Sequence, residues 1–483
     1  MELTRYPRIA SFKSVDRFLE HLQSLGLDLP VDKVIEPAPI SPLAQPATWH
    51  ERVIGNRFCI LPMEGWDGTA DGGPGEKTVR RWLRFGRSGA KLIWGGEATA
   101  VSREGRANPR QLWIHKGNVK EFERLRAVLV DGHRDRFGTA DDLLVGLQLT
   151  HSGRFSRPNS YDRPEPKILY HHPILDRRLA IPPEHPVLSD NEIREIRNQF
   201  VDAARLALDA GFAFVDIKHC HGYLGHEFLS AFDRPGPYGG CFENRTRFLR
   251  EVMEDIQTSI PGLKVAVRFS AFDSLPYGKD NSGRGIPESW EGLYPYGFGC
   301  NAHDPLQPDL TEARKLVAML SELGVDLICV SAGSPYYSPH IQRPALFPPS
   351  DGYHPPEDPL VGVARQLQAT ADLKRTRERV LVVGSAYSYL QEYLPHVAQA
   401  AVRLGWTDFV GLGRVALSYP ELPADIFAGR PLRTALLCRT FSDCTTAPRH
   451  GLPSGCYPLD EWYRKSPEAA QLREIKELRT SDR

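Results

Sequence analysis

A dense run of proton-handling side chains follows one short apolar segment near the middle of the chain. Val215 and Ile217 alternate with Asp216 and Lys218, which is the period of a buried strand with two different faces. Charged residues on such a strand are costly unless they are paired or line a polar site. The next five positions combine two imidazoles, a thiol and a phenol around a glycine turn, which indicates the mouth of an active site: His219, Cys220, His221, Gly222 and Tyr223.

Two neighbouring apolar segments also carry polar side chains on the face opposite their apolar residues. In residues 145–150 (VGLQLT) the alternation leaves Gln148 opposite the apolar face, and in residues 265–270 (VAVRFS) it leaves Arg268 there. We expect Gln148 and Arg268 to point into the same interior as Asp216 and Lys218. A buried arginine holds an anion or forms a structural pair with a carboxylate, here Asp216, and the residues alone leave both explanations open.

Eight short apolar segments, separated by amphipathic stretches of helical period, must position these side chains. Alternating strands and helices with nearly continuous apolar strands predict a parallel sheet covered by helices. Eight such units fit a closed (β/α)8 TIM barrel, and the absence of an early Gly-x-Gly-x-x-Gly weakens the alternative of a doubly wound sheet. The expected strands are residues 58–63, 90–94, 143–150, 213–218, 264–269, 325–331, 380–384 and 407–412, and the expected helices include 119–134, 190–209, 243–258, 310–323 and 389–404.

Additional segments surround the expected barrel. Three long insertions follow strands at the barrel's C-terminal end, where catalytic loops belong: residues 159–186, 273–308 and 334–359. We therefore expect three parts, namely an N-terminal arm (1–50) with one helix at 14–25, the barrel (51–432), and a short C-terminal extension (433–483) with a charged helix at 467–479.

The composition limits the classes of partner. The 483 residues hold 60 Lys and Arg against 60 Asp and Glu, so no overall field favours nucleic acid or an anionic membrane. No apolar run reaches the ~20 residues that a membrane helix needs. The eight cysteines are scattered, which favours a reducing compartment. These features predict a cytoplasmic protein acting on a small molecule, with neither nucleic acid nor membrane as partner.

Five groups of motifs occur in order along the expected barrel. They are 56–63 (NRFCILPM) with 71–74 (DGGP), 97–101 (EATAV) with 105–106 (GR), 148–154 (QLTHSGR), 221–224 (HGYL) with 228–230 (FLS) and 238–248 (YGGCFENRTRF), and 411–414 (GLGR). In this order they resemble the old yellow enzyme family, FMN-dependent NAD(P)H:flavin oxidoreductases built on a (β/α)8 barrel. The resemblance covers residues 56 to 432.

The resemblance implies a role for each matching position. Tyr223 would be the proton donor, and His221 would hold the electron-withdrawing group of the substrate. NADH or NADPH would reduce FMN and leave, and an activated alkene would then take a hydride while Tyr223 delivers the proton. A homodimer is also implied. The residues at FMN would be Pro62, Met63 and Glu64 beside the ring, Ala98 and Gln148 at its pyrimidine edge, Arg268 near N1 and O2, and Gly384, Ser385, Gly413 and Arg414 around the phosphate.

Two positions depart from the family pattern. Lys218 stands where the family has a histidine, and Glu64 stands where it has threonine or cysteine. We expect Lys218 to pair with Glu64 or to bind a carboxylate-bearing substrate, a Lys218–Asp216 pair being the structural alternative. An inward lysine at a strand end also permits a second function, a Schiff-base lyase or isomerase on the same barrel.

The C-terminal extension partly resembles the iron–sulfur segment of longer members of the superfamily. Only three cysteines are present, Cys438, Cys444 and Cys456, whereas a [4Fe–4S] cluster normally needs four thiolates. We therefore expect buried structural thiols and no metal.

Overall fold

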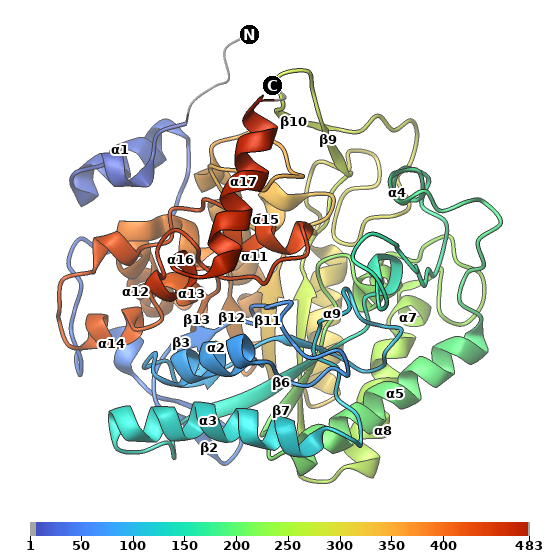
Figure 1. Ribbon diagram of the computed structural model, residues 1–483, viewed down its shortest axis with the longest axis horizontal. Coiled ribbons are helices and arrows are strands. Elements are labelled where there is room, and N and C mark those ends of the chain that lie inside the picture. The colour runs from blue at the N-terminus through green and yellow to red at the C-terminus, as the bar shows by residue number, and fades with distance from the viewer. Residues whose placement is uncertain (1–5, 482–483) are drawn as a thin grey trace.

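Eight parallel strands close into a barrel in the computed structural model, which describes residues 6–481 (Figure 1). Each expected segment contains one strand, and β13 pairs back to β3, so the (β/α)8 prediction is confirmed. In barrel order the strands are β3 (Phe58–Ile60), β4 (Leu92–Ile93), β6 (Leu144–Thr150), β7 (Phe214–Ile217), β8 (Lys264–Ser270), β11 (Leu327–Ser331), β12 (Leu381–Gly384) and β13 (Phe409–Leu412).

A short strand that the sequence pattern did not predict, β5 (Ala98–Ala100), continues the path of β4 and pairs with β6. The chain bends between β4 and β5 at Gly95 and Gly96, whose φ angles are 125° and 58°. A Cβ atom at Gly95 would lie 2.4 Å from the backbone nitrogen of Gln148. Glycine is therefore required where the chain crosses so close to β6.

The two faces of the strands pack as the alternation predicts. Inside the barrel, side chains such as Trp94, Phe214 and Cys329 form one buried cluster. The opposite faces, including Leu147 and Val215, pack against the helices in the main core. Consequently Gln148, Asp216 and Arg268 point inward.

The barrel helices surround the strands. They include α2 (Glu76–Gly86), α3 (Val119–Phe137), α5 (Asp190–Asp209), α8 (Arg247–Ser259), α9 (Thr311–Glu322), α11 (Pro359–Thr376), α12 (Leu394–Arg403) and α14 (Leu422–Phe427). The bounds of α5 match the prediction, and Ser189 and Glu192 form the capping box that starts it.

Two helix predictions need correction. Residues 243–258 are split between α7 (Phe242–Arg245) and α8, and the segment at 389–404 starts as a 3₁₀ stretch (Tyr387–Tyr393) because Gln391 has φ 50° and ψ −111°. Two further helices, α2 and α11, follow the first and sixth barrel strands.

The N-terminal arm lies along the barrel. Its helix α1 (Val15–Ser24) is capped by Ser14, and the ring of Phe18 stacks on Tyr393 with centroids 4.2 Å apart. The hairpin of β1 (Ala47–Trp49) and β2 (Arg52–Ile54) follows it, and Trp49 and Ile54 join the cluster inside the barrel.

The insertions and the C-terminal extension carry smaller elements. The insertions include α4 (Pro173–Leu179), α10 (Pro339–Gln342) and a hairpin of β9 (Tyr277–Lys279) and β10 (Gly285–Pro287). The extension holds α15 (Asp443–Arg449), α16 (Glu461–Arg464) and α17 (Pro467–Ser481). In Figure 1, α17 and the β9–β10 hairpin lie toward the same end of the molecule.

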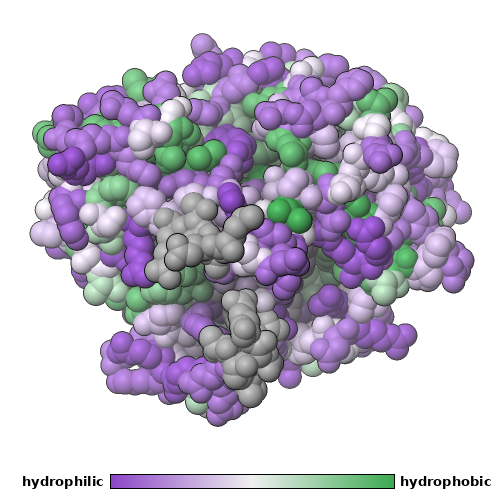
Figure 2. All heavy atoms as spheres, turned by 90° about the horizontal axis from the view of Figure 1, so that it is seen from above, coloured by the Kyte–Doolittle hydropathy of each residue, from purple (hydrophilic) through white to green (hydrophobic). Residues whose placement is uncertain are grey.

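The molecular face at that end is mostly hydrophilic, with hydrophobic residues in small separate groups (Figure 2). Within residues 6–481, no helix combines the length and apolar character that crossing a membrane requires.

Candidate active site

A cavity of about 220 Å³ opens at the C-terminal ends of the barrel strands. Its walls combine strand ends, the insertion at residues 334–359 and the C-terminal extension. Ten of the thirteen predicted site residues line it: Pro62, Met63, Glu64, Lys218, His221, Tyr223, Arg268, Ser385, Gly413 and Arg414. Ala98, Gln148 and Gly384 are not among the lining residues.

Tyr223 and His221 enter this cavity from the turn between β7 and α6 (Leu224–Leu229). The hydroxyl of Tyr223 lies 2.9 Å from that of Tyr336. Nε2 of His221 lies 2.8 Å from Oγ of Ser331. Burial, and then the positive charge of Arg268, hold the pKa of His221 well below its usual value, so its imidazole is neutral. Burial and the nearby Glu64 raise the pKa of Tyr223 well above 10, so its phenol keeps the proton.

Glycine at position 222 makes this turn possible. Its φ is 78°, and a Cβ atom there would lie 2.9 Å from both Oγ of Ser334 and the ring of Tyr337. His221, with φ 68°, is also in the left-handed region, and its N–H donates to Oγ of Ser270 at 3.1 Å. The backbone thus adopts a costly conformation that aims His221 and Tyr223 into the cavity.

Lys218 forms an ion pair with Glu64, with 3.3 Å between Nζ and Oε1. Its ammonium group also lies 3.9 Å from the centroid of the Tyr223 ring, within cation–π range. The described residues contain no ion pair between Lys218 and Asp216. Glu64 and Asp216 were the two partners within the chain considered for Lys218. The structure shows the pair with Glu64.

Asp216 accepts hydrogen bonds from three groups inside the barrel. Trp94 Nε1 donates at 2.7 Å, Gln148 Nε2 at 2.6 Å, and the backbone N–H of Arg268 at 2.6 Å. Burial raises the pKa of Asp216 to about 6, although these bonds oppose the shift. The Asp216–Arg268 interaction is therefore made by the backbone of Arg268, and the carboxylate fixes the amide of Gln148, whose register partner is Ala98.

Three arginines of the cavity keep buried N–H groups that have no partner in the described structure: Nε of Arg268, Nη2 of Arg343 and Nη1 of Arg414. Arg343 and Arg414 line the same cavity, and burial followed by the charge of Arg414 lowers the pKa of Arg343. Two neighbouring cations with free donors form a site for an anion such as a phosphate. Since Ser385 and Gly413 lie on the same walls, the residues fit FMN, with its phosphate at Arg343 and Arg414.

The C-terminal extension supplies a further wall: Cys444, Thr445, Pro448, Arg449 and Ser454. The guanidinium carbon of Arg449 lies 4.8 Å from the ring centroid of Tyr336, whose other face stacks on Phe155 at 4.0 Å. The sequence analysis missed Tyr336, Arg343 and Arg449. They belong to an insertion and to the extension, where no periodicity or motif marks a residue that faces the site.

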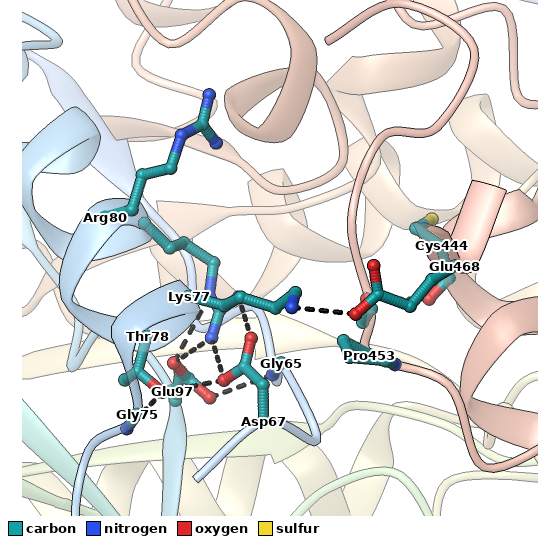
Figure 3. Close-up of polar contacts among 12 residues, drawn as sticks. Gly65, Asp67, Gly75, Lys77, Thr78, Arg80, Glu97, Cys444, Pro453 and Glu468 are labelled. Atoms are coloured by element: carbon teal, nitrogen blue, oxygen red, sulfur yellow. Dashed lines mark hydrogen bonds and ion pairs between the residues drawn. The ribbon is translucent and has the colours of Figure 1, made fainter. Parts of the chain in front are cut away.

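A buried ionic cluster holds the loop that carries Glu64. Arg81 of α2 donates two hydrogen bonds of 2.8 Å to Asp67 and contacts Glu97 at 2.5 Å. Glu97 accepts from the backbone N–H of Gly65 at 2.8 Å, and Figure 3 shows Asp67, Glu97 and Gly65 close together. A Cβ atom at Gly65 would lie 1.9 Å from Nη2 of Arg81, so a larger residue here would displace this guanidinium group from the cluster.

The three cysteines of the extension are partly buried and pack against the main core. Burial raises the pKa of the Cys444 and Cys456 thiols. Within the described residues, no group of three or more His, Cys, Asp or Glu side chains is arranged to hold a metal ion.

The sequence of this chain is similar to those of known proteins. The profile of the NADH:flavin oxidoreductase / NADH oxidase family matches residues 42–286. An NADH oxidase of Thermoanaerobacter brockii is 26% identical over 80% of this chain and 51% of its own length. An NADPH dehydrogenase of Geobacillus is 31% identical over 49% of this chain and 65% of its own length. The chain thus spans about half to two thirds of these relatives.

Among solved structures, the old yellow enzyme homologue from Zymomonas mobilis has a TM-score of 0.55 and 22% identity. The similarity covers 81% of this chain and 93% of that one. At this level of sequence identity, the similarity supports the fold alone.

Proposed function

Since the chain belongs to the NADH:flavin oxidoreductase / NADH oxidase family, we propose that it is an FMN-dependent oxidoreductase that takes a hydride from NADH or NADPH and passes it to an activated alkene. FMN, when bound, supplies the centre that accepts and returns the hydride. The observation that carries the proposal is that one cavity holds both the Tyr223–His221 pair and three arginines with unpartnered N–H groups.

The side chains of the cavity can perform the remaining steps. The neutral imidazole of His221 is available to hydrogen-bond the electron-withdrawing group of the acceptor, where negative charge develops. The phenol of Tyr223 keeps its proton until carbon accepts it. Tyr336 bonds to the Tyr223 hydroxyl at 2.9 Å and so orients it. Arg343 and Arg414 would hold the cofactor's phosphate, and Arg268 its ring.

The Schiff-base alternative has less support. A lysine that forms a Schiff base must attack as a neutral amine. The Nζ atom of Lys218 is instead engaged by Glu64 at 3.3 Å and by the face of the Tyr223 ring at 3.9 Å, so it is not free to attack a carbonyl carbon. The pairing also means that the acceptor need not carry a carboxylate, because Lys218 already has an anionic partner.

Stopped-flow oxidation of the NADPH-reduced holoenzyme tests the proposal. We expect rapid oxidation by an enone or nitroalkene, and a rate lower by about 10²- to 10⁴-fold in Tyr223→Phe, which loses the acid. Tyr457→Phe, a tyrosine of the extension outside the cavity, is the matched control. If the reduced enzyme responds only to dioxygen and quinones, the ene-reductase assignment is wrong.

A further inference from the structure

A second cavity, of about 270 Å³, adjoins the first. Pro335 and Tyr336 line both cavities, so the two are neighbours across one short wall. Ligand pockets usually measure about 300–1,000 Å³. Each cavity alone is below that range and the two together are within it, as expected if one long ligand extends through both.

The three insertions build this second cavity together. Residues 159–186 supply Arg178, residues 273–308 supply one side, and residues 334–359 supply the remainder. The full lining is Arg178, Tyr277, Gly278, Lys279, Glu288, Pro335, Tyr336, Pro339, Pro349, Asp351, Gly352 and Tyr353. Three segments far apart in the sequence therefore meet here, beside the site that the strand ends form.

Contacts between the insertions hold the walls in place. Arg178 pairs with Glu288 at 2.5 Å, which joins the first insertion to the second. The ring of Tyr277 packs edge-on against His340, with centroids 4.4 Å apart, and Tyr353 bonds to the same histidine at 2.7 Å. The N–H of Gly285 donates to the carbonyl of His354 at 2.9 Å, which joins the second insertion to the third. The cavity is therefore pre-formed.

The lining has two chemical features. Tyr277 and Tyr353 present aromatic surface, on which a flat ring can stack. Both lining carboxylates are already in ion pairs, Glu288 with Arg178 and Asp351 with Arg449 at 2.9 Å. Lys279 has no ion-pair partner among the described residues, so its charge is available. An aromatic ring joined to a phosphate matches this lining.

We propose that the second cavity binds the adenosine diphosphate half of NADH or NADPH while the nicotinamide lies in the first cavity. This inference rests on the proposed function, which makes the dinucleotide the reductant. Adenine would stack on the tyrosines, and Lys279 would contact a phosphate oxygen. The insertions would then serve to recognise the reductant, and the strand ends would carry the chemistry.

The test compares NADPH with reduced nicotinamide mononucleotide, which lacks the adenosine half. The variants are Lys279→Ala, Tyr277→Leu and Gly278→Leu. A Cβ atom at Gly278 meets only Glu288 at 3.5 Å and Arg178 at 3.9 Å. The leucine side chain would therefore fill the cavity without a backbone clash. Ile286→Gln, on the paired strand of the hairpin and 44% exposed, is the matched control.

We expect the dissociation constant for NADPH in stopped-flow flavin reduction to rise at least fivefold in the three variants, and that for the mononucleotide to change less than twofold. Equal changes for both reductants, or none, would overturn the inference, as would an effect confined to the alkene acceptor, which would assign the cavity to the acceptor.

If neither reductant bleaches the wild-type flavin, the proposed function fails. Calorimetric titration of the holoenzyme with ADP-ribose then decides the inference, since binding that the variants do not weaken would also overturn it.

Discussion

Lys218 and Glu64 place two opposite charges beside each other where the resemblance positions the flavin ring. Their 3.3 Å ion pair leaves little net charge, although each residue alone would change the electrostatic potential at the ring strongly. Pairing with Glu64 was one of the arrangements expected for Lys218 from the sequence. The structure indicates one paired exchange, in which the cation compensates the anion.

Removing one member of this pair should shift the reduction potential of the bound flavin. Lys218→Met leaves an unpaired carboxylate that opposes electron uptake, so we expect a midpoint potential lower by on the order of 30 mV, equivalent to about 1.4 kcal/mol for a two-electron couple. Glu64→Gln should raise it. The double variant should lie near wild type, because both charges are then gone. Anaerobic reductive titration against a reference dye measures all four proteins, and a double variant no closer to wild type than Lys218→Met would contradict the pairing.

At the scale of elements, the sequence predicted the strands well and the functional loops only in part. Alternation fixes the faces of β6, β7 and β8, so Gln148, Asp216 and Arg268 could be placed inside the barrel. A side-chain pair of Asp216 with Arg268 was one of two explanations left open. The three donors to Asp216 are instead Trp94, Gln148 and the backbone N–H of Arg268, which no local pattern identifies. Arg343 and Arg449 were missed because their positions depend on how irregular segments pack, which periodicity does not encode.

The cluster of Arg81, Asp67 and Glu97 makes α2 a structural support for the Glu64 loop (Figure 3). Arg81→Met would leave two buried carboxylates without their shared cation, and we expect a loss of about 3–5 kcal/mol in the free energy of unfolding. Arg87→Met, at an exposed position just after the same helix, should remain within about 0.5 kcal/mol of wild type. Urea unfolding measures both. Equal stabilities of the two variants would show that the cluster contributes little.

The packing of α2 on α3 includes a histidine that should make stability depend on pH. Nδ1 of His133 lies 2.7 Å from the carbonyl of Gly86, and burial lowers the pKa of His133 to about 4. Between pH 6.5 and 4 the unfolded chain binds the proton that the folded chain excludes, so stability falls as the pH decreases through this range. We expect His133→Gln to remove about 1–2 kcal/mol of that decrease, since one pKa unit corresponds to about 1.4 kcal/mol before solvent screening.

Unfolding curves at several pH values measure this effect as the difference between wild type and variant. His303→Gln, at an exposed position in the second insertion, is the control and should follow the wild-type curve. A difference for His133→Gln that stays constant from pH 7 to 4 would mean that the substitution acts through packing and not through protonation.

At the scale of the whole molecule, the C-terminal extension lies across the cavity and contributes Thr445, Arg449 and Ser454 to its lining. Ion pairs to α2 contribute to its attachment to the barrel. Asp460 accepts two hydrogen bonds of 2.9 Å from Arg80 and one of 2.6 Å from Arg84, and Lys77 pairs with Glu468 at 2.8 Å. The same helix therefore supports the Glu64 loop on one side and the extension on the other.

Asp460→Asn should weaken this attachment, because it removes the charge that two arginines share. We expect FMN to bind about tenfold more weakly, corresponding to about 1.4 kcal/mol, since part of the cavity wall becomes mobile. Quenching of flavin fluorescence on titration with apoprotein measures the dissociation constant, and limited trypsin digestion reports on the extension. Glu461→Gln, which affects only an exposed pair between the first residue of α16 and Lys465 just after it, is the matched control. Faster cleavage of the extension with unchanged FMN affinity would show that this wall does not hold the cofactor.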